Sequence, residues 1–404
     1  MQIKKTVGVA AVLVSTAVVL AGCASSGSSS GSSSSPSTTE AALAATSATS
    51  FKRDFSSMAA LKPLASKGTG NVTVILPDTV SSARYTEFDA PYLKEAFTAA
   101  GLTSSQFTVQ NAQGSDATQL TDAQSAITAG SKVLVVDPLD AGVGAKIEEY
   151  AKQHSVKVID YDRLTLGGTR AYYVSFDNVK VGELIGNGLV TCTKDWNVSK
   201  PAVIEMKGDP TDNNATLFAQ GYDSVLNPLY SSGWTKVAEP AGTWDPPTAA
   251  TEFAQAYTAH PNANAALVPN DENAAPIITY LKNHGIKEKA FPITGQDATL
   301  VGLQNILSGY QCGTAYKPIY LEAQAAAALA MYLRADVTPP AGLVNGSTMD
   351  TVSKVAVPSV LLKPEWVTTS NMNSTVIADK FVTAAQLCTS SFAAACKAAG
   401  IPTS

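Results

Sequence analysis

An acid and a base stand side by side where an apolar run of the sequence ends. In VIDYDRLTLGG, residues 158–168, the pair is Asp162 and Arg163, and the chain then turns at Gly167 and Gly168. A carboxylate accepts hydrogen bonds and a guanidinium donates them in paired geometry, which suits the vicinal hydroxyls of a small polar ligand. Such charge-assisted bonds are about twice as strong as neutral ones. The alternative interpretation is a structural ion pair, and the rest of the chain has to separate the two.

Polar side chains also follow the other apolar segments of the chain. They are Arg84, Tyr85, Asp137, Asn213, Asn214, Asn270 and Asp297. At any single position the alternative is a helix cap, because Asp and Asn side chains accept from the free N–H groups of a helix start. Asp140 and Asp271 are predicted to be caps or turn residues. Arginine and lysine carry no acceptor, so Arg84, Arg163 and Lys317 cannot cap an N-terminus.

Short apolar strands that alternate with helices must position these residues. The predicted strands are 71–77, 133–137, 156–160, 172–176, 202–206, 265–269 and 291–295, and helices are predicted at 89–100, up to about residue 154, and from about residue 216. Continuous apolar strands separated by helices indicate parallel sheets covered on both faces. There are enough units for two doubly wound α/β domains. Ligands of such sheets bind beyond the carboxyl ends of the strands, where the polar residues lie.

The N-terminus is predicted to be a lipoprotein signal peptide. Lys4 and Lys5 precede an apolar run at 7–21, which is shorter than the roughly 20 residues that span a bilayer. The run ends in Leu-Ala-Gly-Cys, a bacterial lipobox, so cleavage after residue 22 and lipidation of Cys23 are expected. The alternative is an ordinary cleaved signal with a chance cysteine. A Ser/Gly-rich tether is expected at 23–70, with the folded part starting near residue 51 or 71.

The composition is that of a globular protein of two domains. The chain has 404 residues, of which 45% are hydrophobic and 15% charged, and its formal net charge is −5. This acidic balance and the lack of a basic patch in the sequence argue against nucleic-acid binding.

Four cysteines follow Cys23, namely Cys192, Cys312, Cys388 and Cys396. An even number in an exported protein indicates disulfides. Of the three possible pairings we favour Cys388–Cys396, which are close in sequence, with Cys192–Cys312 remaining; free buried thiols are the alternative. No paired C-x-x-C occurs and the histidines are scattered, so no metal site and no cofactor are predicted.

Several motifs together resemble one family. The sequence is similar to the bacterial periplasmic sugar-binding proteins of ABC transporters, of the ribose/galactose type. The stretches that carry the resemblance are DYDRL (160–164), YYVSFDNVKVGELIG (172–186), DPTDNNATLFAQG (209–221), NDENAA (270–275), TGQDATLVGLQNI (294–306), TAYKPIYLEA (314–323) and VPSVLLKPEWV (357–367). The likeness covers about residues 71–385.

The resemblance implies two Rossmann-like α/β lobes joined by a three-strand hinge, the type I periplasmic binding protein fold. The N-terminal lobe would comprise 71–176 plus 318–356, and the C-terminal lobe 177–317 plus 357–404. The hinge would lie near Phe176–Asn178, Thr314–Tyr316 and Val357–Ser359. A helix from about 319 to 335 would return to the N-terminal lobe.

The resemblance also implies the ligand contacts. The sugar-gripping pair falls on Asp162 and Arg163, and the remaining contacts fall on Arg84 and Tyr85, Asn213 and Asn214, Asn270, Asp297 and Lys317. Asp137 is a further candidate where an uncharged residue would be expected, which bears on the preferred sugar epimer. Trp244 is the candidate for stacking on the sugar ring, with a core or surface tryptophan as the alternative.

The implied function is a monomeric receptor, lipid-anchored to the outer face of the cell membrane. It would bind a monosaccharide, D-xylose or a related aldose, and deliver it to the permease of an ABC transporter. One alternative is a sensor for a chemotaxis or quorum-type signal. Another is a sugar-processing enzyme that uses Asp162 and Asp297 as its two carboxylates. The sequence contains no G-x-S-x-G, P-loop or H-E-x-x-H motif, which argues against catalysis.

Overall fold

The computed structural model describes residues 38–402, which belong to one compact unit. The predicted signal peptide and Cys23 lie outside the described residues. Within residues 38–402, no helix combines the length and the apolar character that crossing a membrane requires.

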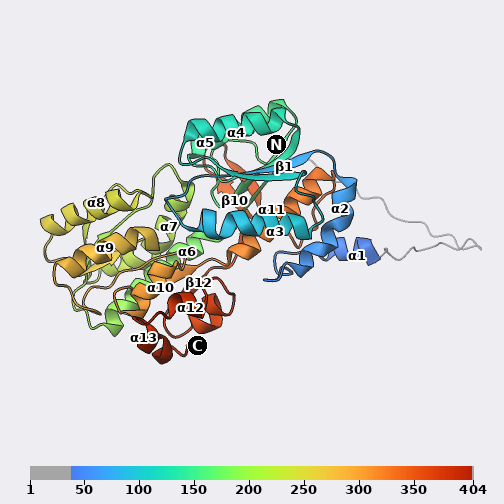
Figure 1. Ribbon diagram of the computed structural model, residues 1–404. Coiled ribbons are helices and arrows are strands. Elements are labelled where there is room, and N and C mark those ends of the chain that lie inside the picture. The colour runs from blue at the N-terminus through green and yellow to red at the C-terminus, as the bar shows by residue number, and fades with distance from the viewer. Residues whose placement is uncertain (1–37, 403–404) are drawn as a thin grey trace, which may run out of the picture. The chain divides into compact units, whose positions relative to one another are not determined.

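A seven-stranded sheet forms the centre of the larger lobe (Figure 1). Its order is β10-β11-β5-β4-β3-β1-β2, and every neighbouring pair is parallel except β10 with β11. The strands are β1 (Asn71–Leu76), β2 (Phe107–Asn111), β3 (Ser131–Val136), β4 (Lys157–Tyr161), β5 (Tyr172–Phe176), β10 (Gly346–Asp350) and β11 (Val355–Leu362). The central strands β1, β3, β4 and β5 are almost fully buried, as expected for a sheet that is covered on both faces.

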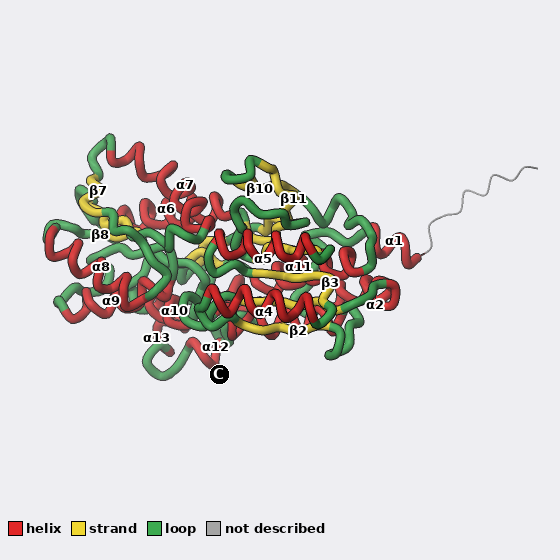
Figure 2. Tube along the Cα trace, turned by 90° about the horizontal axis from the view of Figure 1, so that it is seen from above, coloured by secondary structure: helices red, strands yellow, loops and turns green. Residues whose placement is uncertain are grey.

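Two helices cover each face of this sheet. The helices α4 (Asp116–Thr128) and α5 (Ala141–Gln153) lie on one face, and α3 (Ala90–Ala99) and α11 (Ile319–Arg334) on the other (Figures 1 and 2). Ala323 and Ala325–Ala328 of α11 are fully buried, because small side chains allow the helix to pack closely on the sheet. The larger lobe is therefore doubly wound, as predicted.

The smaller lobe is built on a three-stranded parallel sheet of order β7-β6-β8. Its strands are β6 (Ala202–Glu205), β7 (Thr235–Ala238) and β8 (Ala265–Leu267), and its helices are α6 (Asn178–Asp195), α7 (Asn213–Tyr230), α8 (Pro246–Ala259), α9 (Asp271–Asn283) and α10 (Leu300–Leu307). The strand predicted at 291–295 is not formed, since only the bridge between Ala266 and Ile293 pairs there. The helix predicted from about residue 216 begins at Asn213, because Asp212 caps it.

The chain passes between the lobes three times. It leaves the large sheet after β5 and returns from β9 (Thr314–Tyr316) into α11; the last passage runs from β11 to β12 (Glu365–Val367), which pairs with β9. We predicted the third passage at Val357–Ser359. Instead Ser359 pairs with Tyr173 and Gly346 inside the large sheet, and the passage falls at residues 363–364. The predicted boundary between 356 and 357 was therefore wrong by about six residues.

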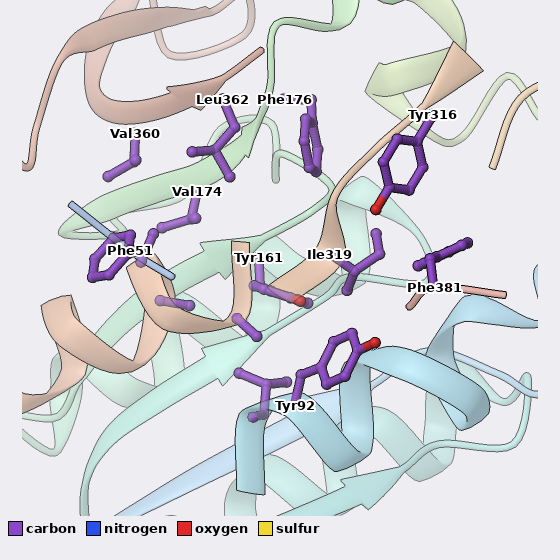
Figure 3. Packing of buried hydrophobic residues seen from close by; sticks show 14 of the residues in the cluster. Phe51, Tyr92, Tyr161, Val174, Phe176, Tyr316, Ile319, Val360, Leu362 and Phe381 are labelled. Carbon is purple, nitrogen blue, oxygen red and sulfur yellow. The ribbon is translucent and has the colours of Figure 1, made fainter. Parts of the chain in front are cut away.

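The predicted tether is shorter than expected, because residues before 71 already pack on the larger lobe. They form α1 (Thr38–Ala44), the 3-10 helix η1 (Ser56–Leu61) and α2 (Lys62–Lys67). Phe51, Phe55 and Met58 are almost completely buried. Figure 3 shows Phe51 in the same cluster as Val174 and Val360. Phe51 and Phe55 lie in irregular backbone before η1, so no helical pattern in the sequence marks them as buried.

The C-terminal segment packs beside the smaller lobe. It contains η3 (Asn373–Ile377), α12 (Ala384–Leu387) and α13 (Ala393–Ala398), and α12 contacts α10. A short π-helix, η2 (Tyr85–Asp89), precedes α3 in the other lobe, and its Phe88 stacks on Phe381 with ring centroids 3.8 Å apart. The cysteines pair as predicted, Cys192 with Cys312 and Cys388 with Cys396.

Candidate functional site

The strand ends of the two lobes face each other around a cavity. Its volume is about 30 Å³, so the two lobes lie close together around it. Nine of the eleven predicted ligand contacts line it. They are Arg84, Tyr85, Asp162, Arg163, Asn214, Trp244, Asn270, Asp297 and Lys317. Asp137 and Asn213 are buried nearby but do not line the cavity.

Arg84 enters the cavity from the larger lobe and is held by three carboxylates. Its Nη1 donates to Asp162 Oδ1 at 2.8 Å, and its Nε and Nη2 form a paired contact with Asp89 at 2.9 and 2.8 Å. The same Nη2 donates to Glu322 Oε2 of α11 at 2.5 Å. A guanidinium fixed by two elements loses little rotamer freedom when it binds a ligand, so the site is preorganised.

Asp162 follows β4 in a left-handed backbone conformation, with φ of 58°. Besides Arg84, it accepts from the Tyr85 hydroxyl at 3.2 Å, and Lys317 Nζ lies 4.0 Å from its Oδ1. Burial acts to raise the pKa of Asp162, but the nearby Arg84, Lys317 and Arg163 outweigh it and lower this pKa. Asp162 is thus a carboxylate at neutral pH, able to accept hydrogen bonds.

Arg163 connects the two lobes. Its Nη2 donates to Tyr85 Oη at 3.1 Å, and its Nε lies 3.4 Å from Asp212 Oδ2 of the smaller lobe. Asp137 Oδ1 is 3.7 Å from the same Nε, and neither oxygen of Asp137 accepts a hydrogen bond from another described residue. Burial, and next the charge of Asp162, raise the pKa of Asp137 well above its usual range. Asp137 lies behind Arg163 and not on the cavity wall, which corrects its predicted place as a direct contact.

The smaller lobe contributes the amide of Asn214 and the ring of Trp244. Asn214 Nδ2 donates to the carbonyl oxygen of Asp162 at 2.9 Å, so it joins the lobes directly. Trp244 Nε1 donates to Asp212 Oδ2 at 3.0 Å, which fixes the indole beside Phe218 in an edge-to-face contact. Asn213 differs from the prediction, since it is buried at the start of α7 and does not line the cavity, although its neighbour does.

Asp297 and Lys317 form an ion pair on the cavity wall. Lys317 Nζ lies 3.0 Å from Asp297 Oδ1, and Ser82 Oγ of the larger lobe donates to Asp297 Oδ2 at 3.2 Å. Although burial acts to lower it, the pKa of Lys317 is raised by Asp297 and Asp162. Asn270 caps α9 and also donates from Nδ2 to the carbonyl of Ser81 at 3.3 Å. Asn270 therefore caps α9 and also lines the cavity, and its contact with a ligand stays a prediction.

Five further residues line the cavity and were missed by the sequence reasoning. They are Ser81, Ser82, Asp212, Phe218 and Gln296. The sequence did indicate all of them except Phe218, because each of the other four lies within three residues of a predicted contact in a segment that follows a strand. Of the two predicted caps, Asp140 does cap α5, while Asp271 does not cap α9.

The walls of the cavity balance three cations with three carboxylates, and its remaining polar groups are amides and hydroxyls. Between residues 38 and 402 no cluster of His, Cys, Asp or Glu side chains could hold a metal ion. Gln296 Oε1 is buried and accepts no hydrogen bond from a described residue. Such a lining pairs donors and acceptors with a neutral polyhydroxyl compound, whereas a net charge on the ligand would be uncompensated.

The sequence matches the model of the periplasmic binding protein domain family over residues 72–336. It is 38% identical over 277 residues to the D-xylose-binding periplasmic protein of Escherichia coli, which covers 68% of this chain and 80% of the relative. It is also 32% identical over 331 residues to the multiple sugar-binding periplasmic protein SbpA of Azospirillum brasilense, covering 78% of this chain and 90% of that protein.

A solved structure has a similar overall fold. It is a carbohydrate transporter solute-binding protein from Chloroflexus aurantiacus in complex with D-glucose, with a TM-score of 0.68 and 26% sequence identity. The match covers 78% of this chain and 97% of the other.

Proposed function

The chain belongs to the periplasmic binding protein family, and we propose that it binds one neutral monosaccharide between its lobes and delivers it to an ABC importer. Members of this family are binding proteins of transporters and not enzymes, so the chain is not an enzyme. The family also implies a place outside the cytoplasm. The lobes correspond to the two halves that close on a ligand in a hinge motion.

The observation that carries the proposal is the cavity wall, which both lobes build together. Asp162, Arg163 and Arg84 come from the larger lobe, and Asn214 and Asp297 from the smaller one. A ligand that contacts both sets favours the closed form by its differential affinity. Arg84, Asp162, Arg163, Asn214, Asp297 and Lys317 are proposed to hydrogen-bond the sugar hydroxyls, and Trp244 to cover an apolar face of the ring.

Two relatives suggest which sugar is bound. The Escherichia coli relative binds D-xylose by its name, and the Azospirillum relative is named for multiple sugars. We propose D-xylose or a related aldose as the ligand of this chain. The cavity lies between the lobes and is lined by both, which supports a small ligand that the lobes can enclose together.

The membrane attachment is a separate proposal. Cys23 would carry the lipid, and the residues between it and the packed segment from residue 38 would tether the monomeric receptor to the outer face of the membrane beside its permease. Mass spectrometry of the membrane fraction tests this. A diacylglyceryl modification on Cys23 supports the anchor, and a cleaved protein without lipid contradicts it.

A thermal-shift screen tests the binding proposal. A ligand that binds only the folded state stabilises it by about 2.7 kcal/mol when present at 100 times its Kd. The panel contains D-xylose, L-arabinose, D-ribose, D-glucose and the disaccharide xylobiose. We expect a rise in Tm with one or two monosaccharides and none with xylobiose. No shift with any monosaccharide would overturn the proposal.

A further inference from the structure

Asp271 is a buried carboxylate that lies beside the cavity without lining it. It is the first residue of α9 and is completely buried, but Asn270 supplies the cap of this helix. Asp271 is therefore not explained by the helix start, which is the role that its sequence position predicts.

The carboxylate of Asp271 receives hydrogen bonds from three residues that are distant in sequence. Its Oδ2 accepts from the backbone N–H of Thr299 at 2.9 Å and from the hydroxyls of Thr299 and Thr314, each at 3.2 Å. Its Oδ1 accepts from Gln311 Nε2 at 2.7 Å. In return, the backbone N–H of Asp271 donates to the carbonyl of Gln296 at 3.0 Å.

The segment held in this way is the one that presents Asp297 to the cavity. Asp297 and Ala298 both have positive φ angles, 87° and 50°. Left-handed backbone at non-glycine residues costs about 1–3 kcal/mol each and persists only where the surroundings enforce it. The contacts of Asp271 at Gln296 and Thr299 contribute to that constraint, together with the hydrogen bonds of the Asp297 N–H to the carbonyl of Ala315 at 2.9 Å and of the Ala298 N–H to Thr314 Oγ1 at 3.1 Å.

Two glycines make room for the carboxylate. A Cβ atom on Gly295 would lie 2.0 Å from Asp271 Oδ1, and one on Gly302 would lie 2.1 Å from Oδ2. Both residues need the absence of a side chain so that the backbone can approach Asp271 this closely. The packing around this carboxylate is thus tight on two sides.

We propose that Asp271 is a positioning residue of the ligand site, which holds residues 296–299 so that Asp297 faces the sugar and Lys317. The inference rests on the proposed sugar binding and deepens it. Asp271 itself touches no ligand, so its effect on affinity passes through Asp297. A merely structural role would lower stability without depending on Asp297.

A double-mutant cycle on the purified protein tests this coupling. We expect Asp271→Ala to weaken sugar binding by about tenfold to a hundredfold in calorimetry, the loss expected when a hydrogen bond to a charged group no longer forms. Asp297→Ala should weaken binding by at least as much. In the Asp297→Ala background, Asp271→Ala should cause little further loss, because the side chain that it positions is gone.

The isosteric variant Asp271→Asn keeps the proposal testable if the alanine variant fails to fold. Its Oδ1 can still accept from Thr299, and its amide can donate to Gln311, whose Oε1 is without a partner among the described residues and can turn towards it. We expect Asp271→Asn to retain most of the affinity. The matched control is Asp116→Ala, which removes an exposed acid at the first position of α4.

The outcomes separate the two proposals. Additive losses in the cycle, or full affinity in Asp271→Ala, would overturn the positioning role while sugar binding by the wild type still stands. Lack of sugar binding by the wild type would overturn the proposed function first. Loss of affinity in Asp116→Ala equal to that in Asp271→Ala would show that the effect is not specific to Asp271 and would contradict the inference.

Discussion

Replacing Arg163 with alanine separates the two interpretations of the Asp162–Arg163 pair, because a structural ion pair and a ligand contact predict different losses. The hydrogen bonds of Arg163 to Tyr85, Ser81 and Leu139 stay within the larger lobe, so we expect them to persist when the lobes open. Only the contact with Asp212 at 3.4 Å crosses to the smaller lobe. A ligand contact and the Asp212 contact are thus the two interactions that closure alone provides.

The affinity loss follows from those two interactions. Removing one partner of a buried, hydrogen-bonded charge pair costs about 2–5 kcal/mol, which is roughly 30-fold to a few thousandfold in Kd. Burial already raises the pKa of Asp212, and Arg163 is the charge that most opposes this rise. Without Arg163, closure would bury Asp212 with only Trp244 and a backbone N–H as donors.

Stability should respond through a different residue. Asp137 belongs to the same lobe as Arg163 and has no hydrogen bond from a described residue. Removing Arg163 should therefore leave the buried Asp137 carboxylate without its ion-pair partner in the open and the closed form, which lowers stability in both. The double variant Arg163→Ala/Asp137→Asn should therefore recover thermal stability relative to the single variant, while its affinity stays low.

The assay is isothermal titration of the sugar that the thermal-shift screen identifies, with Arg163→Lys as the control that keeps the charge. Lysine lacks the planar fork, so an intermediate affinity is expected. Unchanged affinity in Arg163→Ala would refute the reasoning and leave a structural ion pair. Recovery of affinity in the double variant would also refute it, because it would assign the whole loss to Asp137.

Three other predictions concern acid titration, the disulfides and Trp244. Burial raises the pKa of Asp271 to about 7 and that of Glu322 to about 8, so between pH 5 and 7 the folded chain binds more protons than the unfolded one. The free energy of unfolding should therefore fall by about 1.4 kcal/mol per pH unit per group as pH rises, and denaturant melts of Asp271→Asn should show a shallower slope; an equal slope contradicts this. The Cys192–Cys312 bond joins residues 120 positions apart and Cys388–Cys396 joins residues 8 apart, so serine pairs should cost up to about 5 and 2.5 kcal/mol respectively in the chain-entropy account; the reverse order in urea melts would contradict it. Trp244→Ala should weaken sugar binding about tenfold or more without lowering Tm by a comparable free energy, and calorimetry with unchanged affinity would make this tryptophan a wall residue only.

Much of the cavity lining was predictable because ligands of parallel sheets bind beyond the carboxyl ends of the strands. Parallel strands bring their carboxyl ends to one edge, so Arg84, Asp162 and Asp297 converge although they are far apart in sequence. This principle predicts which backbone segments lie at the cavity, but it does not predict which of their side chains line it. Asn213 and Asn214 are neighbours at the start of α7, and only the second of them lines the cavity.

Tertiary packing decided what the sequence could not. Residues 51–64 follow a Ser/Thr/Ala-rich stretch, and their burial depends on a surface of the larger lobe that no local pattern reveals. The third passage lies later than predicted because β11 continues to pair with β5 through Leu362. Asp271 was predicted as a cap, since its four donors come from residues 28 to 43 positions away.

The most direct test of the account is the stoichiometry and affinity of one aldose, measured by titration calorimetry on wild type, Asp297→Ala and Asp116→Ala. The account predicts one site per chain, D-xylose or a close relative as the ligand, wild-type affinity in Asp116→Ala, and a loss of at least tenfold in Asp297→Ala. A sugar that binds all three proteins equally would place the site outside the cavity and contradict the central claim.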